Sequence, residues 1–194
     1  AQQINRDMEE GHPHQEKLRI IVDQVAHMEQ LLREMLDYSR PIELRLQAHS
    51  FNEMVKEVVS LCSVSAKEAE VEIIQETDPA MDSPPMDGGR MKQVLLNLVQ
   101  NAVQASPRGG RVWVITRLTS KYVEVEGADQ GSGIPQEHWE KLFFPFFTTK
   151  RGGTGLGLAI SHKIVEAHGG VLELVKSNEN GTTFRVQLPI KRKD

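Results

Sequence analysis

A glycine-rich run at residues 152–157, Gly-Gly-Thr-Gly-Leu-Gly, is the feature of the sequence best suited to chemistry, and an apolar stretch follows it directly. Unpaired backbone N–H groups and the positive dipole end at a helix N-terminus bind anions, most often phosphate. A simple flexible turn before a helix would have the same composition. The run lacks the Gly-Lys-Ser/Thr ending of a P-loop, and its spacing differs from that of the dinucleotide fingerprint. It therefore allows phosphate binding of a kind outside both of these motifs.

A carboxylate followed by spaced glycines occurs at Asp129–Gly133, directly after a predicted strand. A carboxylate at a strand end can accept a hydrogen bond from the exocyclic amino group of a base, and Gly131 and Gly133 would let the backbone approach a flat ring closely. A tight turn is the alternative interpretation of the same residues. The segment is thus a candidate binding site for a nucleotide base.

Two asparagines, Asn97 and Asn101, lie four residues apart and therefore on one face of a predicted helix whose other positions are mostly apolar. A hydrated Mg²⁺ ion with its phosphates is one polar partner that such a pair could serve, and neighbouring side chains are another. Four phenylalanines within residues 143–147 precede the glycine run. They predict either core packing or an anchor for a lid, residues 148–155, that would cover a nucleotide.

The elements that must position these residues alternate between helical and strand patterns. We expect three helices, at 52–69 with Asn52 as the cap, at 87–106 with Asp87 near the start, and at 154–168. Alternation of apolar and polar residues predicts five strands, at 71–75, 112–118, 122–126, 171–175 and 182–188. The second and third of these are expected to form one hairpin, and the last two another. Hairpin strands with helices on one side predict a two-layer α/β sandwich rather than a doubly wound parallel sheet.

A long amphipathic helix is expected at residues 16–39, before this globular part. Its apolar residues follow a heptad pattern suited to a seam against other helices, at Leu18, Ile21, Val25, Met28, Leu32 and Met35. Gly11 and Pro13 break the chain before it, so residues 1–10 would be the tail of another helix, and Pro41 limits its continuation. The chain is therefore expected to comprise a partial helical hairpin at 1–41 and a globular domain at 42–194.

Composition excludes several classes of function. The formal net charge of −4 argues against a nucleic-acid-binding protein, which would normally present a basic face. No apolar run approaches 18 residues, so we expect no membrane span in this chain, and residues 1–17 have no signal-peptide pattern. The single cysteine, Cys62, lies in an apolar-periodic stretch and is expected to be a buried, reduced thiol. These features are typical of a cytoplasmic protein.

Taken together, four segments resemble in order and spacing the N, G1, F and G2 boxes of sensor histidine kinases, most of all the nitrogen-regulator-type subgroup: NLVQNAVQAS, DQGSGIP, FFPFFTTK and GGTGLGLAI. These kinases share an ATPase superfamily with gyrase, MutL and a heat-shock chaperone. The resemblance covers roughly residues 50–190, and residues 37–41 resemble the close of a dimerisation helix. It implies an α+β fold, a two-layer α/β sandwich that binds ATP, preceded by part of a dimerisation hairpin.

The resemblance also implies roles for individual residues. Asp129 would bind the adenine amino group, Asn101 would coordinate Mg²⁺, and Lys150 would either offset phosphate charge or remain solvated. Thr182 shares its strand parity with Phe184, so it should face inward and support the base pocket. The complete nucleotide-binding set implied is Asn97, Asn101, Asp129, Gly131, Gly133, Ile134, Thr149, Lys150, Gly153, Thr154, Gly155, Leu156, Gly157 and Thr182.

Asn97 bears on which reaction follows ATP binding. Hydrolysing members of the superfamily typically have a glutamate at this position, four residues before the Mg²⁺-binding asparagine. An amide cannot act as a general base near neutral pH, so the sequence favours transfer of the γ-phosphate to a protein side chain. The alternative function is an ATP-dependent conformational module or hydrolase of the same superfamily.

The acceptor histidine expected from the resemblance is not found, because the sequence contains no His-Glu or His-Asp dipeptide. His12 and His14 flank Pro13 in the apparent loop between helices, and His27 lies in mid-helix. Either the acceptor helix begins upstream of Ala1, which we favour, or the protein has lost its acceptor. The resemblance further implies a homodimer of the full-length protein, a response regulator receiver domain as partner, and any membrane anchor upstream of this chain.

Overall fold

The computed structural model describes residues 15–81, 83–150 and 152–190. The helix tail predicted at 1–10 and the loop with His12 and His14 lie outside these ranges. The chain divides into two compact units, which join between Arg40 and Pro41.

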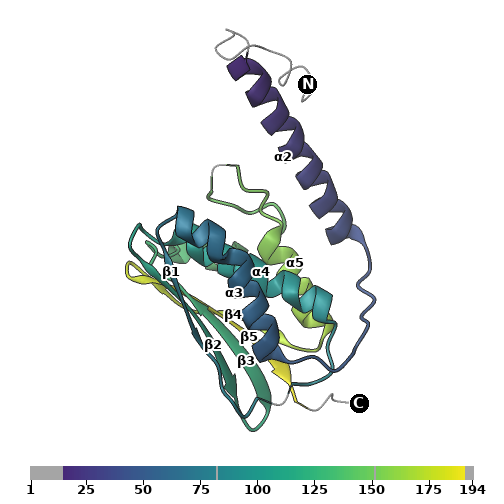
Figure 1. Cartoon of the computed structure of the whole chain (residues 1–194). Helices are drawn as coiled ribbons and strands as arrows, with labels where there is room; N and C mark the ends of the chain where they lie inside the picture. Colours follow the sequence, from purple (N-terminus) through teal and green to yellow (C-terminus); the bar gives the residue numbers. More distant parts are fainter. Residues whose placement is uncertain (1–14, 82, 151, 191–194) are drawn as a thin grey trace. The chain divides into compact units, whose positions relative to one another are not determined.

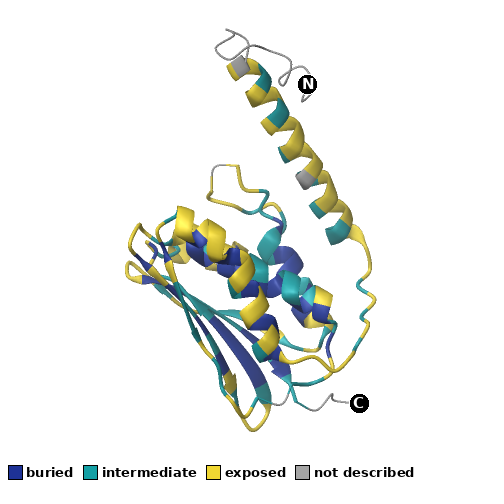
Figure 2. Cartoon of the chain, in the orientation of Figure 1, coloured by how far each residue is buried: buried dark blue, intermediate teal, exposed yellow. Residues whose placement is uncertain are grey.

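Helix α2, Gln15–Ser39, confirms the helix predicted at 16–39. Helix α2 is largely exposed (Figure 2): its apolar heptad residues range from 44% exposed for Val25 to 61% for Leu32, except Leu18, which is half-buried. Burying such side chains is the main source of helix stability in proteins. The helix therefore carries an apolar stripe suited to packing against other helices. None of the described helices is long and apolar enough to cross a membrane.

The second unit is built on a five-stranded sheet in the order β1-β2-β3-β5-β4 (Figure 1). Its strands are β1 Glu72–Glu76, β2 Arg111–Leu118, β3 Tyr122–Ala128, β4 Val171–Asn178 and β5 Gly181–Pro189. Both predicted hairpins, β2–β3 and β4–β5, are present, and β3 pairs antiparallel with β5 to join them. Only β1 pairs in parallel, with β2. All five predicted strands are found, although most extend one to three residues beyond their predicted ends.

Three helices cover one face of this sheet: α3 Phe51–Glu68, α4 Gly88–Ala105 and α5 Gly157–Ala167 (Figure 1). The two-layer sandwich is therefore confirmed. A short 3₁₀ helix, η1 Gln136–Lys141, lies between β3 and α5. The core between the layers contains alternate residues of the strands, such as Val112, Val114 and Val125, against buried helix side chains (Figure 2). Cys62 of α3 is fully buried in it as a free thiol, as predicted.

Two helix starts differ from the prediction. Ser50, not Asn52, caps α3: its hydroxyl accepts from the Glu53 amide at 3.3 Å. Asn52 already lies inside the helix, where its side chain donates to the Asp78 carbonyl and accepts from Thr116 Oγ1. Helix α5 begins at Gly157 rather than 154, because Gly155 has a φ of +68°, which a right-handed helix does not allow.

Asp87 joins three parts of the sandwich. Its Oδ1 caps α4 by accepting from the Arg90 amide at 3.0 Å, and its Oδ2 accepts from the Arg45 amide at 3.0 Å. Its own backbone N–H donates to His168 Nε2 at the end of α5, at 3.0 Å. The imidazole therefore carries its proton on Nδ1, which donates to the Ile164 carbonyl at 2.8 Å. These bonds fix the start of α4 relative to the end of α5.

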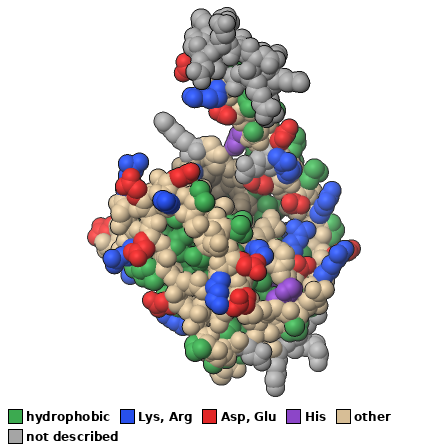
Figure 3. All heavy atoms as spheres, viewed as in Figure 1, with side chains coloured by type: hydrophobic (Ala, Val, Ile, Leu, Met, Phe, Trp, Pro, Cys, Tyr) green, Lys and Arg blue, Asp and Glu red, His purple; other side chains and the backbone are tan. Residues whose placement is uncertain are grey.

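The sheet face opposite the helices is polar. Glu124 and Glu126 of β3 are only 9% and 8% exposed, and Arg185 of β5 contacts both carboxylates. Arg185 also reaches Glu173 of β4 at 3.3 Å. Buried charges need partners of this kind. On the face of the molecule shown in Figure 3, basic and acidic side chains are likewise interspersed.

Candidate functional site

Asp129 lies directly after β3 and is bound to β5 by its backbone and its side chain. Its N–H donates to the Thr182 carbonyl at 2.9 Å, and its Oδ1 accepts from the Thr182 amide at 3.1 Å. The same Oδ1 accepts from the Gly131 amide at 2.8 Å. Among the described residues, both bonds to this carboxylate thus use Oδ1. The geometry leaves Oδ2 as the acceptor for a ligand.

The environment of Asp129 opposes its charge. Burial raises the pKa of this carboxyl, while the amides of Gly131 and Thr182 and the charge of Lys150 act in the opposite direction. Burial is the largest of these effects. A desolvated acceptor of this kind binds a donor group more strongly than a carboxylate in water would.

Three glycines enclose this corner. A Cβ on Gly131 would lie 2.7 Å from the Ala105 carbonyl oxygen, at the end of α4. A Cβ on Gly133 would overlap the backbone of Asn178, and a Cβ on Gly181 would overlap the carbonyl of Asp129. Gly133 and Gly181 also have φ values of +76° and +133°. Only glycine fits these positions without a shift of the backbone.

The segment after Gly133 is tied to β4 and β5. The Ile134 amide donates to Ser177 Oγ at 2.7 Å, and Ser177 Oγ lies 3.0 Å from Thr182 Oγ1. The Ile134 carbonyl accepts from Trp139 Nε1 at 2.9 Å. Thr182 is 5% exposed, in agreement with the inward orientation predicted from strand parity. The corner around Asp129 is therefore held on three sides.

A row of side-chain amides runs along α4 at the other end of the candidate site. Asn97 Nδ2 donates to Ser161 Oγ of α5 at 3.0 Å, and Asn101 Nδ2 donates to Asn97 Oδ1 at 3.3 Å. Lys150 Nζ donates to Asn101 Oδ1 at 2.7 Å and to Gln104 Oε1 at 2.9 Å. The prediction that the two asparagines share a face is confirmed. Asn97 thus donates to α5 and Asn101 donates to Asn97, which leaves Asn101 Oδ1 to accept from Lys150.

The glycine run brings the start of α5 against this row. Gly157 is the first residue of the helix, and a Cβ there would overlap Asn97 Oδ1. Thr154 Oγ1 accepts from the amide of Leu156, which is fully buried. Because the first amides of a helix have no intrahelical partner, this helix start offers N–H groups beside Asn97.

The rest of the predicted lid is exposed. Thr149, Gly153 and Lys150 are all exposed residues, although the Lys150 ammonium lies against α4. Desolvation of the ammonium beside α4 lowers the pKa of Lys150 although the residue as a whole is exposed, and the charge of Asp129 opposes this effect. Thr148 Oγ1 accepts from the Lys150 amide at 3.1 Å, which shapes the turn.

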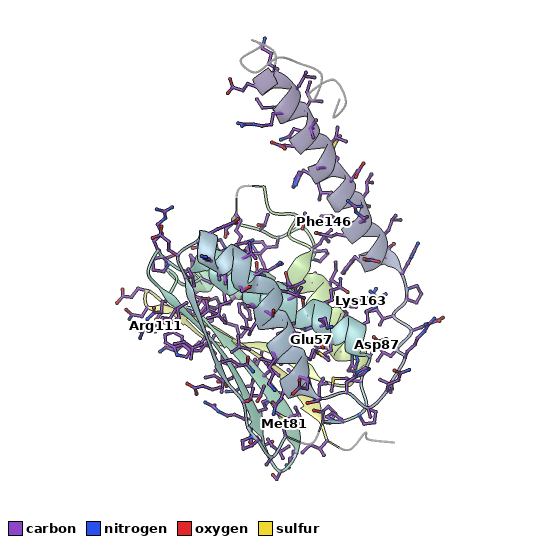
Figure 4. All side chains as sticks on the ribbon, viewed as in Figure 1. Glu57, Met81, Asp87, Arg111, Phe146 and Lys163 are labelled. Atoms are coloured by element: carbon purple, nitrogen blue, oxygen red, sulfur yellow. The ribbon has the colours of Figure 1, made fainter. Side chains whose placement is uncertain are left out.

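The phenylalanines before the lid divide into two kinds. Phe143 stacks on His162 of α5 with ring centroids 4.8 Å apart, and Phe147 lies 5.3 Å from the His138 ring. Phe144 and Phe146 are 62% and 57% exposed. Phe146, labelled in Figure 4, has a φ of +66°, and a Cβ on Gly155 would overlap its backbone. The cluster therefore both packs and presents aromatic rings at the base of the lid.

Three residues of this arrangement were missed by sequence reasoning. Ser161 is 2% exposed and accepts the hydrogen bond of Asn97, Gln104 shares Lys150 with Asn101, and Gly181 closes the corner at Asp129. Of the three, only Gly181 could have been identified from its neighbours in the sequence, because the pair Asn180-Gly181 is typical of a hairpin turn such as that between β4 and β5.

The side chains around Asn101 suit Mg²⁺, which takes few ligands from protein, better than a metal ion whose ligands all come from protein side chains. The described residues contain no group of three or more His, Cys, Asp or Glu that could hold a metal ion. Mg²⁺ often keeps several waters and takes few protein ligands besides substrate phosphates. Asn101 Oδ1 is an oxygen of the required kind, and it already faces a cation, the Lys150 ammonium.

Comparisons with known proteins identify the family of the chain. The family described as histidine kinase-, DNA gyrase B-, and HSP90-like ATPase matches residues 86–192. The chain is similar to the signal transduction histidine-protein kinase AtoS of Escherichia coli (strain K12), with 35% identity over 189 residues, 97% of this chain and 31% of AtoS. The chain thus spans about a third of the length of that relative.

Two solved structures resemble the chain. Full-length ShkA in complex with AMPPNP has a TM-score of 0.83 and 25% identity, over 94% of this chain and 40% of ShkA. Histidine kinase ThkA in complex with the response regulator TrrA has a TM-score of 0.80 and 31% identity, over 98% of this chain and 55% of that one. Both likenesses extend over nearly the whole length of this chain.

Proposed function

The chain belongs to the family of histidine kinase-, DNA gyrase B- and HSP90-like ATPases, with the catalytic ATP-binding domain of a sensor histidine kinase, and we propose that it donates the γ-phosphate of ATP to a histidine. From that histidine the phosphate would pass to the receiver domain of a response regulator. ThkA, a similar kinase, was crystallised with a response regulator. We further propose that the full-length protein is a cytoplasmic or cytoplasm-facing homodimer that uses the apolar stripe of α2.

One observation carries the proposal: α4 connects two ends of a site with opposite chemistry. A desolvated carboxylate, Asp129, lies beside the end of α4, where Gly131 approaches the Ala105 carbonyl. Amide groups, a lysine and the start of α5 line the middle of the same helix, at Asn97 and Asn101. ATP combines an amino-bearing base with an anionic triphosphate, so it matches both ends.

We assign the individual roles on this basis. Asp129 Oδ2 accepts from the adenine amino group, Gly131, Gly133 and Ile134 lie along the base, and Thr182 supports them. Asn101 Oδ1 holds Mg²⁺, which when bound neutralises part of the phosphate charge. The remaining predicted residues surround the phosphates: Asn97, Thr149, Lys150, Gly153, Thr154, Gly155, Leu156 and Gly157.

The surroundings of Asn97 favour transfer to a side chain over hydrolysis. Its Nδ2 donates to Ser161 and its Oδ1 accepts from Asn101, so both halves of the amide are engaged. An amide in this position cannot take a proton from water. The arrangement therefore positions phosphate without activating a water molecule. A hydrolase or conformational module of the same family is the alternative.

The test is a transfer assay between two chains. This chain would be mixed with Mg²⁺, γ-labelled ATP and a longer form of the protein that carries the acceptor helix but has Asp129→Asn in its own ATP site. We expect label on a histidine of the longer form, and none when both chains carry Asp129→Asn. Steady release of phosphate without any labelled histidine would show that the chain is a hydrolase and not a kinase.

A further inference from the structure

Lys150 occupies the oxygen that the proposed function assigns to Mg²⁺. Its ammonium donates to Asn101 Oδ1 at 2.7 Å, and the second acceptor, Gln104 Oε1, lies 2.9 Å away. The two acceptors are three residues apart on α4 and so lie on one face, whereas Lys150 belongs to the loop at 148–150. The contact therefore holds this loop against α4.

The amide row orients that oxygen toward a cation. Because Asn101 Nδ2 is used in donating to Asn97, its Oδ1 must point to the opposite side. Asn97 is in turn fixed by Ser161, which is buried in α5. The absence of a side chain on Gly157 leaves room for the Asn97 carbonyl. The row thus keeps one oxygen ready for a positive charge, whichever cation supplies it.

From this geometry we infer that the Lys150 ammonium binds the oxygen of the metal site and acts as a latch that holds the loop against α4. Lys150 must leave this oxygen when Mg²⁺ and ATP bind. This inference rests on the proposed function. A metal ion would bind Asn101 Oδ1 at about 2.1 Å, and a lysine ammonium on the same oxygen would then be in contact with a like charge. The triphosphate that arrives with the metal offers the ammonium a new anionic partner. Exchange of partners by Lys150 would thereby release the loop only when ligand is present.

Gln104 allows the latch to be weakened without removing the lysine. It holds the ammonium from the side and has no assigned contact with nucleotide or metal. Gln104→Ala removes one of the two acceptors that hold the ammonium against α4, so it should tighten binding of Mg²⁺ and AMPPNP by about two- to fivefold, in keeping with one charge-assisted hydrogen bond at a partly exposed position. A lysine that served only to bind phosphate would leave this affinity unchanged.

The experiment compares the native chain, Gln104→Ala and Lys150→Met, with Lys121→Met in the β2–β3 turn as the matched control. Hydrogen exchange of the amides at 148–150 and 152–155 is measured without nucleotide or metal, and AMPPNP binding is measured by calorimetry with Mg²⁺. We expect exchange to rise at least threefold in both latch variants and not in the control, with tighter binding for Gln104→Ala.

Unchanged exchange in Lys150→Met, or unchanged affinity in Gln104→Ala, would overturn the latch. Thermal unfolding of each variant checks that the sandwich is intact. The exchange measurement needs no ligand, so it tests the latch even if the native chain fails to bind AMPPNP. That failure would contradict the proposed function instead, and the two results remain distinguishable.

Discussion

The two ends of the candidate site are built in different ways. Around Asp129 the backbone determines the shape: strands β3 and β5 exchange hydrogen bonds, and glycines pass within contact distance of carbonyl groups. Around Asn101 the side chains determine it, through a row of amides that ends on a lysine. A backbone-built corner cannot adapt, whereas side chains can exchange partners. The base end is therefore suited to selecting a shape, and the phosphate end to responding to a ligand.

The largest effect should come from adding one methyl group to the backbone-built end. Gly181→Ala places a Cβ against the Asp129 carbonyl at a φ of +133°, so we expect a loss of about 3 kcal/mol or more in the free energy of unfolding, or no folded protein. Urea denaturation measures this. Gly109→Ala is the control, because Gly109 has a φ of +77° but no atom within 4 Å of its Cβ position. It should lose only about 1 kcal/mol; equal losses would show that steric overlap contributes nothing.

Changing the acceptor while keeping the corner should affect binding rather than folding. In Asp129→Asn the amide oxygen can still accept from Gly131 and Thr182, but an NH₂ donor replaces Oδ2 and opposes the adenine amino group. We expect AMPPNP affinity to fall at least tenfold, or about 1.4 kcal/mol. Calorimetric titration measures it, with Glu140→Gln on η1 as a matched carboxylate-to-amide control. Native affinity in Asp129→Asn would contradict the assignment of this end.

A break in the side-chain row should have a smaller effect, spread over stability and binding. Ser161→Ala leaves Asn97 Nδ2 without its acceptor in a buried setting, at an expected cost of about 1–2 kcal/mol in the free energy of unfolding. Affinity for Mg²⁺ with AMPPNP should fall about threefold because Asn101 is less firmly oriented. Ser63→Ala, which removes an exposed hydroxyl on α3, is the control. An effect on binding without Mg²⁺ that equals the effect with it would contradict the role of the row in orienting a metal ligand.

The smallest effect concerns the pH dependence of stability. Burial raises the pKa of Asp129 above the unfolded-state value of about 3.9, so the folded chain binds this proton more readily than the unfolded chain does. At a pH above the pKa of Asp129 in the folded chain, the ionised carboxylate therefore lowers the free energy of unfolding. This loss disappears as the pH falls toward the pKa of the same group in the unfolded chain. Asp129→Asn should be slightly more stable than the native chain at neutral pH, and the two should converge near pH 3. Urea denaturation at several pH values measures this, and an advantage that grows on acidification would contradict it.

Sequence patterns predicted the helices and hairpins, which depend on local periodicity. They predicted few of the side-chain contacts that depend on packing between segments distant in the sequence. Periodicity located all three sandwich helices and both hairpins, and the order of the four motifs indicated the family. The sequence predicts Asn52 as the cap of α3, but Ser50 caps the helix, and the side chain of Asn52 instead bonds to Thr116, 64 residues away. Ser161 is likewise 64 residues from Asn97, and nothing local marks it.

The contact between Phe146 and Gly155 has a consequence for the chain between them. The backbones of these two residues already meet at the base of the lid. The conformational entropy of closing that loop is therefore lost when the domain folds, and not when a nucleotide binds. Doubling the length of a closed loop costs only about 0.6 kcal/mol. The lid is therefore the part of the pocket whose length can vary most freely, and insertions there should alter how the site opens without dismantling the site itself.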